Sequence, residues 1–142
     1  MRPAASSRSP ITQAGRWSYD KGVLKPIQIL TTLPPSYTGN NTCAEVFVAP
    51  SGRFVDGSNR GHDSVVIFAV GQNTGELTAI AWAPTQGQTP RFFGSDPTGS
   101  YLYAAKQNSD TVVIFRVNQT TGRLRATGEV IKVGSPSTIV FR

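Results

Sequence analysis

Hydrophobic and polar residues of this chain alternate in short runs that are separated by turns rich in Gly, Pro, Asn and Thr. Runs such as 64–70 and 111–117 are rich in valine, isoleucine and phenylalanine, which favour β-strands. The turns at 50–52 and 73–75 combine residue types that reverse the chain direction. No segment repeats its hydrophobic residues with the 3.6-residue period of an amphipathic helix. The pattern therefore predicts an all-β protein.

The predicted strands fall into two sets of four, with incomplete sets on either side. The complete sets comprise 43–48, 53–59, 64–70 and 77–83, and then 91–95, 101–106, 111–117 and 124–132. A strand that ends near Asp20 and a strand over 25–33 precede them, and 136–141 begins a further set. Residues 1–14 show no period and are interpreted as a disordered or divergent tail, so that 15–142 form the folded part.

The two complete sets are copies of one another. Residues 50–82 match residues 97–129 without a gap when 47 is added to each number, so that Asp63 pairs with Asp110. A period of this length built from short strands is typical of β-propeller blades, of which a complete propeller has about four to eight. We therefore expect a partial β-propeller: about two complete four-stranded antiparallel blades plus parts of two others.

Charge and composition narrow the expected partners. The net charge is +6, of which the first 25 residues carry +4 and the remaining 117 carry +2. A nucleic-acid-binding surface normally shows a basic stripe in the folded part, and none is visible, so we expect no nucleic-acid partner. The composition, with 38% hydrophobic and 15% charged residues, is that of a globular protein.

The sequence lacks the features of several kinds of binding site and of membrane or secreted proteins. Cys43 is the single cysteine, which excludes an internal disulfide and a multi-cysteine zinc site. No apolar run reaches the length of a membrane span, and the first residues lack the apolar core of a secretion signal. P-loop, dinucleotide-binding, nucleophile-elbow and zinc-protease motifs are absent. We therefore expect a cytoplasmic protein without a membrane partner, a metal or a cofactor.

The segment 58–62, with the sequence Ser-Asn-Arg-Gly-His, differs between the copies, because its counterpart 105–109 shares none of its residues. Asp63, which both copies share, is interpreted as structural, since a carboxylate before a strand can accept backbone N–H groups in a tight turn. Arg60 and His62 together can supply an anion clamp and a titratable base. The alternative is an ordinary solvated turn.

Two further side chains are expected near the central channel of the propeller. Alternation along a strand places Cys43, Glu45 and Phe47 on one side of an innermost strand. Glu45 could orient a water or a sugar hydroxyl there, or could bond backbone donors of the next blade. Arg91 opens the equivalent strand of the second copy, where it either points toward the channel or has a structural role.

Seven short motifs are distributed over both copies. They are Ala44-Glu45, Pro50-Ser51-Gly52-Arg53-Phe54, Ser58-Asn59-Arg60-Gly61-His62-Asp63-Ser64, Gly87-x-x-Pro90-Arg91-Phe92, Asp96-Pro97-Thr98-Gly99, Gln107-x-Ser109-Asp110 and Thr121-Gly122-x-Leu124. Together they resemble the lactonase seven-bladed β-propeller family, which includes the propeller-type 6-phosphogluconolactonases and the fungal carboxy-cis,cis-muconate lactonizing enzymes. The resemblance covers residues 19–142 and points to the C-terminal part of such a propeller.

The resemblance implies that a lactone of an acidic, sometimes phosphorylated, substrate is hydrolysed or formed at the mouth of the channel. A His, a Glu and two Arg from different blades are implied as the site, and only Arg60 is the counterpart of one of them. Arg60 is thus the predicted catalytic residue, with His62, Glu45 and Arg91 as candidate substrate-binding residues. We expect the parent activity to be hydrolysis of a sugar lactone such as 6-phosphogluconolactone, and the chain alone to be inactive.

Two positions depart from the family pattern. Asp56 places a charge in mid-strand, which is unfavourable in a buried sheet, and Lys106 stands where the family commonly has asparagine. Both are interpreted as sequence drift. The alternative to an enzyme is a non-catalytic propeller fragment that acts as a binding module. Such a fragment is expected to self-associate, because a partial propeller leaves sheet edges open.

Overall fold

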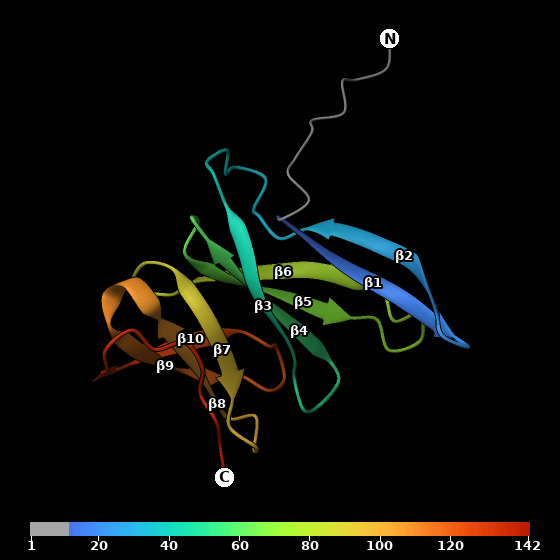
Figure 1. Ribbon diagram of the computed structural model, residues 1–142. Coiled ribbons are helices and arrows are strands. Elements are labelled where there is room, and N and C mark those ends of the chain that lie inside the picture. Colours follow the sequence, from blue (N-terminus) through green and yellow to red (C-terminus); the bar gives the residue numbers. More distant parts are fainter. Residues whose placement is uncertain (1–11) are drawn as a thin grey trace.

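The computed structural model describes residues 12–142, which form three antiparallel sheets (Figure 1). The first sheet pairs β1 (Gln13–Asp20) with β2 (Val23–Thr31). The first blade contains, in spatial order, β3 (Thr42–Val48), β4 (Phe54–Arg60), β5 (Ser64–Val70) and β6 (Leu77–Pro84). The second blade contains β7 (Pro90–Ser95), β8 (Tyr101–Lys106), β9 (Thr111–Val117) and β10 (Leu124–Lys132), with a short 3-10 turn at Gln107–Ser109.

Each blade is a meander in which consecutive strands are neighbours, as the turn signals between them predict. The predicted strands 64–70, 101–106, 111–117 and 124–132 coincide with β5, β8, β9 and β10. The predicted all-β partial propeller is confirmed: two complete four-stranded antiparallel blades and a two-stranded part of a third sheet. None of the described residues belongs to a helix long and apolar enough to cross a membrane.

The two ends of the described chain differ from expectation. β1 begins at Gln13, inside the predicted tail of residues 1–14, of which 1–11 lie outside the described part. The prediction of a strand over 136–141 is wrong, because these residues form no strand. Among the described residues no strand lies beside them to accept and donate the ladder hydrogen bonds that a strand needs. Phe141 instead packs against Tyr103, with ring centroids 5.2 Å apart.

The hydrophobic core lies between the two blades, at what we call the second interface. Strands β3 and β4 of the first blade contact β7 of the second. The buried residues of this core come from both blades, with Phe47 packed against them; they are Val65, Phe93, Leu102, Ala104, Val113 and Phe115. Leu102 and Ala104 lie on the face of β8 that points to the first blade, and Lys106 follows them on that same face, because side chains alternate along a strand.

The β1–β2 sheet packs on the other side of the first blade, at what we call the first interface (Figure 1). The Gln28 side chain donates to the Leu77 carbonyl and accepts from the Leu77 N–H, both at 2.9 Å. The Trp82 indole N–H donates to the Thr32 carbonyl at 2.9 Å. Polar contacts between side chains and backbone therefore join this sheet to the blade, and Trp82 has a packing role.

Candidate functional site

The four predicted site residues lie at one edge of the two blades, which we call the rim. At the rim β3 and β7 begin and β4 and β8 end, with Thr42 paired to Arg60 and Pro90 paired to Lys106. Because the inner strands β3 and β7 have the same direction and neighbour one another, these ends come together.

Arg60 ends β4, and its Nε atom is buried without a hydrogen-bond partner in the described part of the chain. The face of β4 that Arg60 shares with Phe54 points to the second blade, since Phe54 contacts Gly122 there. Gly61 follows with φ of 128°, and a Cβ at this position would overlap the Asn40 carbonyl oxygen. Only glycine therefore allows the chain to turn directly after the arginine.

Asp63 joins the turn after Arg60 to the second blade. Its Oδ1 atom accepts the Thr89 N–H at 3.0 Å and the Gly61 N–H at 3.4 Å. Its carbonyl accepts the N–H and the hydroxyl of Thr85 at 2.9 and 2.8 Å. Asp110 repeats the arrangement, with Oδ1 accepting the Ser135 N–H at 2.7 Å. The structural interpretation of Asp63 is confirmed, and Asp63 also links the neighbourhoods of Arg60 and Arg91.

His62 is held in place from three sides. Its Nδ1 atom lies 2.6 Å from the Ser64 hydroxyl, and its backbone N–H donates to Asn41 at 3.1 Å. The Tyr37 ring meets the imidazole edge-on, with centroids 4.8 Å apart. His62 is thus a positioned side chain rather than a loose surface residue, and its Nε2 atom has no hydrogen bond to the described residues. Sequence reasoning missed Tyr37, because its loop is brought here only by the tertiary fold.

A β-bulge places Glu45 differently from the prediction. Cys43 pairs with Asn59 and Phe47 pairs with Asp56, with a register shift between Cys43 and Val46. Asn59 and Asp56 point to opposite faces of β4, so Cys43 and Phe47 do as well, and the prediction that they share one side with Glu45 is wrong. The extra residue of the bulge breaks the alternation.

Glu45 itself is half-buried in this bulge, where its backbone N–H donates to the Ser58 hydroxyl at 3.0 Å. Its carboxylate makes no hydrogen bond or ion pair with residues 12–142. Arg91 lies in the same bulge of the second blade, at the register shift between Pro90 and Phe92. It is exposed, and its guanidinium donates to Gln107 at 3.2 Å. Bulges are frequent next to active sites, where they redirect a side chain.

The structure therefore brings Arg60, His62, Glu45 and Arg91 to one rim but does not join them. Within residues 12–142 no hydrogen bond or ion pair connects any two of the four. What they can do together is surround an acidic molecule with two guanidinium groups, an imidazole and a carboxylate.

Two buried ionisable residues, Lys106 at the rim and Asp56 in the middle of β4, were recognised in the sequence only as departures from the family pattern. Lys106 is fully buried, and its Nζ atom has no hydrogen-bond partner in the described part. Burial lowers the pKa of Lys106 to about 8, and the charge of Asp63 partly opposes this shift. Asp56 is 5% exposed with Oδ1 unpartnered, and burial raises the pKa of this carboxyl to about 7. Burying an unpartnered charged group costs stability, so both residues are unfavourable for the fold itself.

The described residues offer little for metal binding or for nucleophilic catalysis by a thiol. In the described residues no three His, Cys, Asp or Glu side chains gather to hold a metal ion. Cys43 is half-buried, its Sγ lies 3.2 Å from the Thr32 hydroxyl, and burial raises the pKa of its thiol. A raised thiol pKa means less thiolate at neutral pH, so Cys43 is a poor nucleophile.

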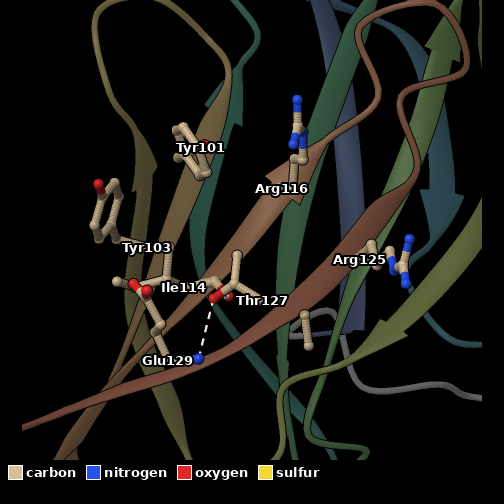
Figure 2. A pocket seen from close by; sticks show the side chains of 8 residues that line it. Tyr101, Tyr103, Ile114, Arg116, Arg125, Thr127 and Glu129 are labelled. Atoms are coloured by element: carbon tan, nitrogen blue, oxygen red, sulfur yellow. Dashed lines mark hydrogen bonds between the residues drawn. The ribbon is translucent and has the colours of Figure 1, made fainter.

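A pocket of about 490 Å³ lies on the opposite face of the second blade, away from the first blade (Figure 2). Figure 2 shows its lining side chains, which include Tyr101, Tyr103, Arg116, Arg125 and Glu129. None of the four predicted site residues contributes to it. The pocket is therefore separate from the rim.

Comparisons with known proteins agree on the architecture. A family model described as lactonase, 7-bladed beta-propeller matches residues 12–141. The 6-phosphogluconolactonase of Bacillus subtilis (strain 168) is 40% identical over 76 residues, which is 54% of this chain and 22% of that protein. The chain thus spans about a fifth of the length of this relative.

Solved structures match over nearly the whole described chain. The Pseudomonas aeruginosa periplasmic gluconolactonase aligns with a TM-score of 0.85 and 28% identity, covering 91% of this chain and 36% of that one. A protein from Lactobacillus plantarum aligns with a TM-score of 0.82 and 31% identity, covering 88% of this chain and 37% of that one. The blades therefore have the same mutual arrangement as a stretch of these larger structures.

Proposed function

Because this chain belongs to the lactonase seven-bladed β-propeller family, we propose that its two blades supply one wall of a site that hydrolyses a sugar lactone such as 6-phosphogluconolactone. The Bacillus subtilis relative is named for that activity, and the Pseudomonas aeruginosa neighbour is named a gluconolactonase. A cytoplasmic location is part of this proposal.

The observation that supports the proposal most is the Arg60 guanidinium, which is partly buried at the rim and has an unpartnered Nε. A guanidinium binds a carboxylate or phosphate through two parallel N–H bonds, and such charge-assisted bonds are stronger than neutral ones. Arg60 is thus suited to hold the acidic group of the substrate, or the oxyanion that develops at the lactone carbonyl.

The reaction itself needs an activated water and a stabilised oxyanion. Water attacks the lactone carbonyl, the tetrahedral oxyanion collapses, and the ring oxygen leaves with a proton to give the open hydroxy acid. Arg60 stabilises the negative charge, and His62 contributes a hydrogen bond from the nitrogen that faces away from Ser64. Glu45 and Arg91, each placed in a bulge, line the approach.

We further propose that the isolated chain hydrolyses the lactone little or not at all. Removing one member of a cooperating catalytic set can abolish most of the rate, and the family resemblance assigns only Arg60 of its set to this sequence. The test is hydrolysis of 6-phosphogluconolactone by the purified chain, compared with the spontaneous rate. A rate well above the spontaneous one that is lost in Arg60→Ala would contradict the proposed inactivity.

Binding of the hydrolysis product tests the proposed site independently of the rate of hydrolysis. We expect 6-phosphogluconate to bind with Arg60 in place and to bind at least tenfold more weakly to Arg60→Ala. Arg123→Ala is the matched control, since Arg123 lies in the exposed β9–β10 turn at the opposite edge of the second blade. Equal binding by all three proteins would contradict the role of Arg60.

A second candidate function, a binding module that self-associates, is favoured by the outer face of the β1–β2 sheet. Trp17, Tyr19 and Ile29 are 51%, 73% and 55% exposed there, an apolar surface that soluble monomers rarely present. β1 also pairs with one strand only, which leaves an edge open to another chain. A concentration series by light scattering tests this, and a monomer at roughly 100 µM would contradict self-association.

A further inference from the structure

The imidazole of His62 belongs to a closed hydrogen-bond cycle at the turn between β4 and β5. The cycle runs from the His62 backbone through Asn41, Asn59 and Ser64 to Nδ1 of the His62 imidazole. Asn59 and Ser64 pair directly across the β4–β5 ladder, and the turn between them carries His62. The direction of the hydrogen bonds in this cycle decides which imidazole nitrogen carries the proton.

Two backbone groups fix the orientation of both asparagine amides in the cycle. The His62 backbone N–H can only donate, and it donates to Oδ1 of Asn41 at 3.1 Å, so Asn41 presents its nitrogen to Asn59. The Thr32 carbonyl can only accept, so the Asn59 atom that lies 2.8 Å from it is the amide nitrogen. These two assignments agree, because the Asn41 nitrogen then donates to the Asn59 oxygen at 3.0 Å.

The orientation of Asn59 determines the direction of the hydrogen bond between Ser64 and His62. The Asn59 nitrogen donates to the Ser64 hydroxyl oxygen at 3.2 Å, so Ser64 accepts on this side. Ser64 is 1% exposed, and among residues 12–142 the only other partner of its hydroxyl is Nδ1 of His62, at 2.6 Å. If Nδ1 also donated, the hydroxyl hydrogen of Ser64 would be buried without an acceptor, which is unfavourable. Ser64 therefore donates to Nδ1.

A neutral imidazole that accepts a hydrogen bond at Nδ1 carries its proton on Nε2. The Tyr37 ring packs edge-on against the imidazole, with centroids 4.8 Å apart, and restricts its rotation. His62 is only partly buried, and its Nε2 atom has no hydrogen bond to the described residues, so this N–H group is available to a ligand. In this tautomer Nε2 already holds a proton and cannot take one from water.

The second blade shows that a blade folds without the hydrogen-bond cycle. Lys106 and Thr111 pair at the same place in its ladder, and Ser109 stands at the position of His62. The Ser109 hydroxyl accepts the Gln88 N–H at 3.1 Å, and Nζ of Lys106 has no hydrogen-bond partner in the described chain. The cycle is therefore a feature of the first blade and not a requirement of the repeat.

We propose that Ser64, oriented by Asn59, is a positioning residue that fixes neutral His62 as the Nε2–H tautomer, so that the imidazole presents a hydrogen-bond donor at the rim rather than a base. The tautomer depends only on contacts within the chain. The use of this donor rests on the proposed function: Nε2–H binds the carbonyl oxygen of a lactone, on which negative charge develops when water attacks. Ser64 is too buried to contact a substrate, so it acts through His62.

The test is NMR spectroscopy of the complete chain labelled with nitrogen-15, at about pH 8.5, where an imidazole is neutral. His62 is the single histidine of the sequence, so the signals of its two ring nitrogens do not overlap with those of another histidine. Long-range proton–nitrogen correlations distinguish a nitrogen that carries a proton from one that does not. We expect the Nε2–H tautomer to exceed the Nδ1–H tautomer at least about tenfold. The same chain unfolded in urea gives the ratio of an unrestrained histidine.

Variants of Ser64 separate positioning from a purely structural role. Ser64→Ala should move the tautomer ratio of the folded chain to the ratio measured in urea, because no hydroxyl then donates to Nδ1. Ser64→Thr keeps a hydroxyl, as Thr111 does at the equivalent position, and should keep the wild-type ratio. Thr111→Ala is the matched control in the second blade and should also keep it. A purely structural role of Ser64 would lower stability in Ser64→Ala without changing the ratio.

A proton on Nδ1 in the wild-type chain would overturn the inference, and this measurement does not depend on the folding of any variant. An unchanged ratio in folded Ser64→Ala would overturn it as well. Titration with 6-phosphogluconate distinguishes these outcomes from a failure of the proposed function. If the Nε2–H tautomer is found and 6-phosphogluconate does not bind, the proposed function fails and the positioning role of Ser64 stands. If 6-phosphogluconate binds to a chain whose Nδ1 carries the proton, the inference fails and the proposed function stands.

Discussion

Asn59 and Lys106 hold equivalent positions in the two blades, 47 residues apart, and each faces the sheet that precedes its own. At the first interface the Asn59 side chain makes four hydrogen bonds, which satisfy both ends of its amide. At the second interface Lys106 is just as deeply buried and has no hydrogen-bond partner for Nζ in the described chain. The two blades therefore have the same backbone arrangement at this position, but one carries a neutral amide and the other a cationic side chain.

The two copies of the repeat share their backbone contacts but differ in the side chains at the interfaces. Asp63 and Asp110, which both copies share, each accept a backbone N–H from the segment that follows their own blade. Where the copies differ, the two interfaces are built differently, as the hydrogen-bonded Asn59 and the unpartnered Lys106 show. The residues that differ at the second interface are Arg60, which ends β4, and Lys106, which ends β8.

Removing the hydrogen-bonded amide of Asn59 at the first interface should have the largest effect on stability. Asn59→Ala leaves Asn41 and Ser64 without their buried partner, and we expect a loss of about 3 kcal/mol in the free energy of unfolding. Urea unfolding measures it. Asn108→Ala is the control, since Asn108 is exposed and makes one hydrogen bond to Thr89. Equal losses would show that the buried network contributes little.

The carboxylate that bridges the blades comes next. Asp63→Ala removes acceptors for Thr89 and Gly61, and we expect a loss of about 2 kcal/mol. Asp110→Ala releases only the Ser135 end of the chain, so its loss should be smaller. The same urea experiment compares them. A larger loss of unfolding free energy for Asp110→Ala than for Asp63→Ala would contradict the role of Asp63 in joining the two blades.

Buried Asp56 should make stability depend on pH. Its pKa is raised to about 7 by burial, whereas the unfolded chain titrates near the ordinary value of 3.8. The cost of burying the charge is therefore absent below about pH 4, grows as the pH rises, and is complete above pH 7. We expect a stability loss on the order of 2 kcal/mol from pH 5 to pH 7.5 and a flatter profile in Asp56→Asn. An unchanged profile in this variant would assign the pH dependence elsewhere.

The smallest expected effect is a gain in the free energy of unfolding. Lys106→Asn removes a buried cation and provides the amide that the first blade uses, so we expect about 1 kcal/mol of added stability at pH 7. The gain should shrink above pH 8, because the folded lysine loses its proton while the unfolded one keeps it until about pH 10.5. Lys132→Asn should show no gain. A destabilised Lys106→Asn would mean that the lysine is structurally favourable.

The sequence predicted the blades well because their signals are local and repeated. The β-branched runs of β5 and β9 and the glycine turns between strands occur twice, so each copy supports the other. The rim was predicted less completely. The period-2 rule assumes a regular strand, so it could not show that a bulge separates Cys43 from Phe47.

Contacts between distant segments were also beyond the sequence. Tyr37 reaches His62 from a loop, which no periodicity indicates. A lysine at a strand end usually extends to solvent, and the full burial of Lys106 follows only from the packing of two blades. The one signal for Lys106 in the sequence was that it stands where the family commonly has asparagine.

The second interface holds a buried lysine whose Nζ has no hydrogen-bond partner in the described chain. A pH titration of the Lys106 side chain by carbon-13 NMR, assigned by comparison with Lys106→Asn, tests it most directly. We expect a pKa of about 8 for Lys106, well below the 10.5 of an ordinary lysine. A pKa at or above 10.5 would contradict it, because such a value requires solvent or a close counter-charge around Nζ.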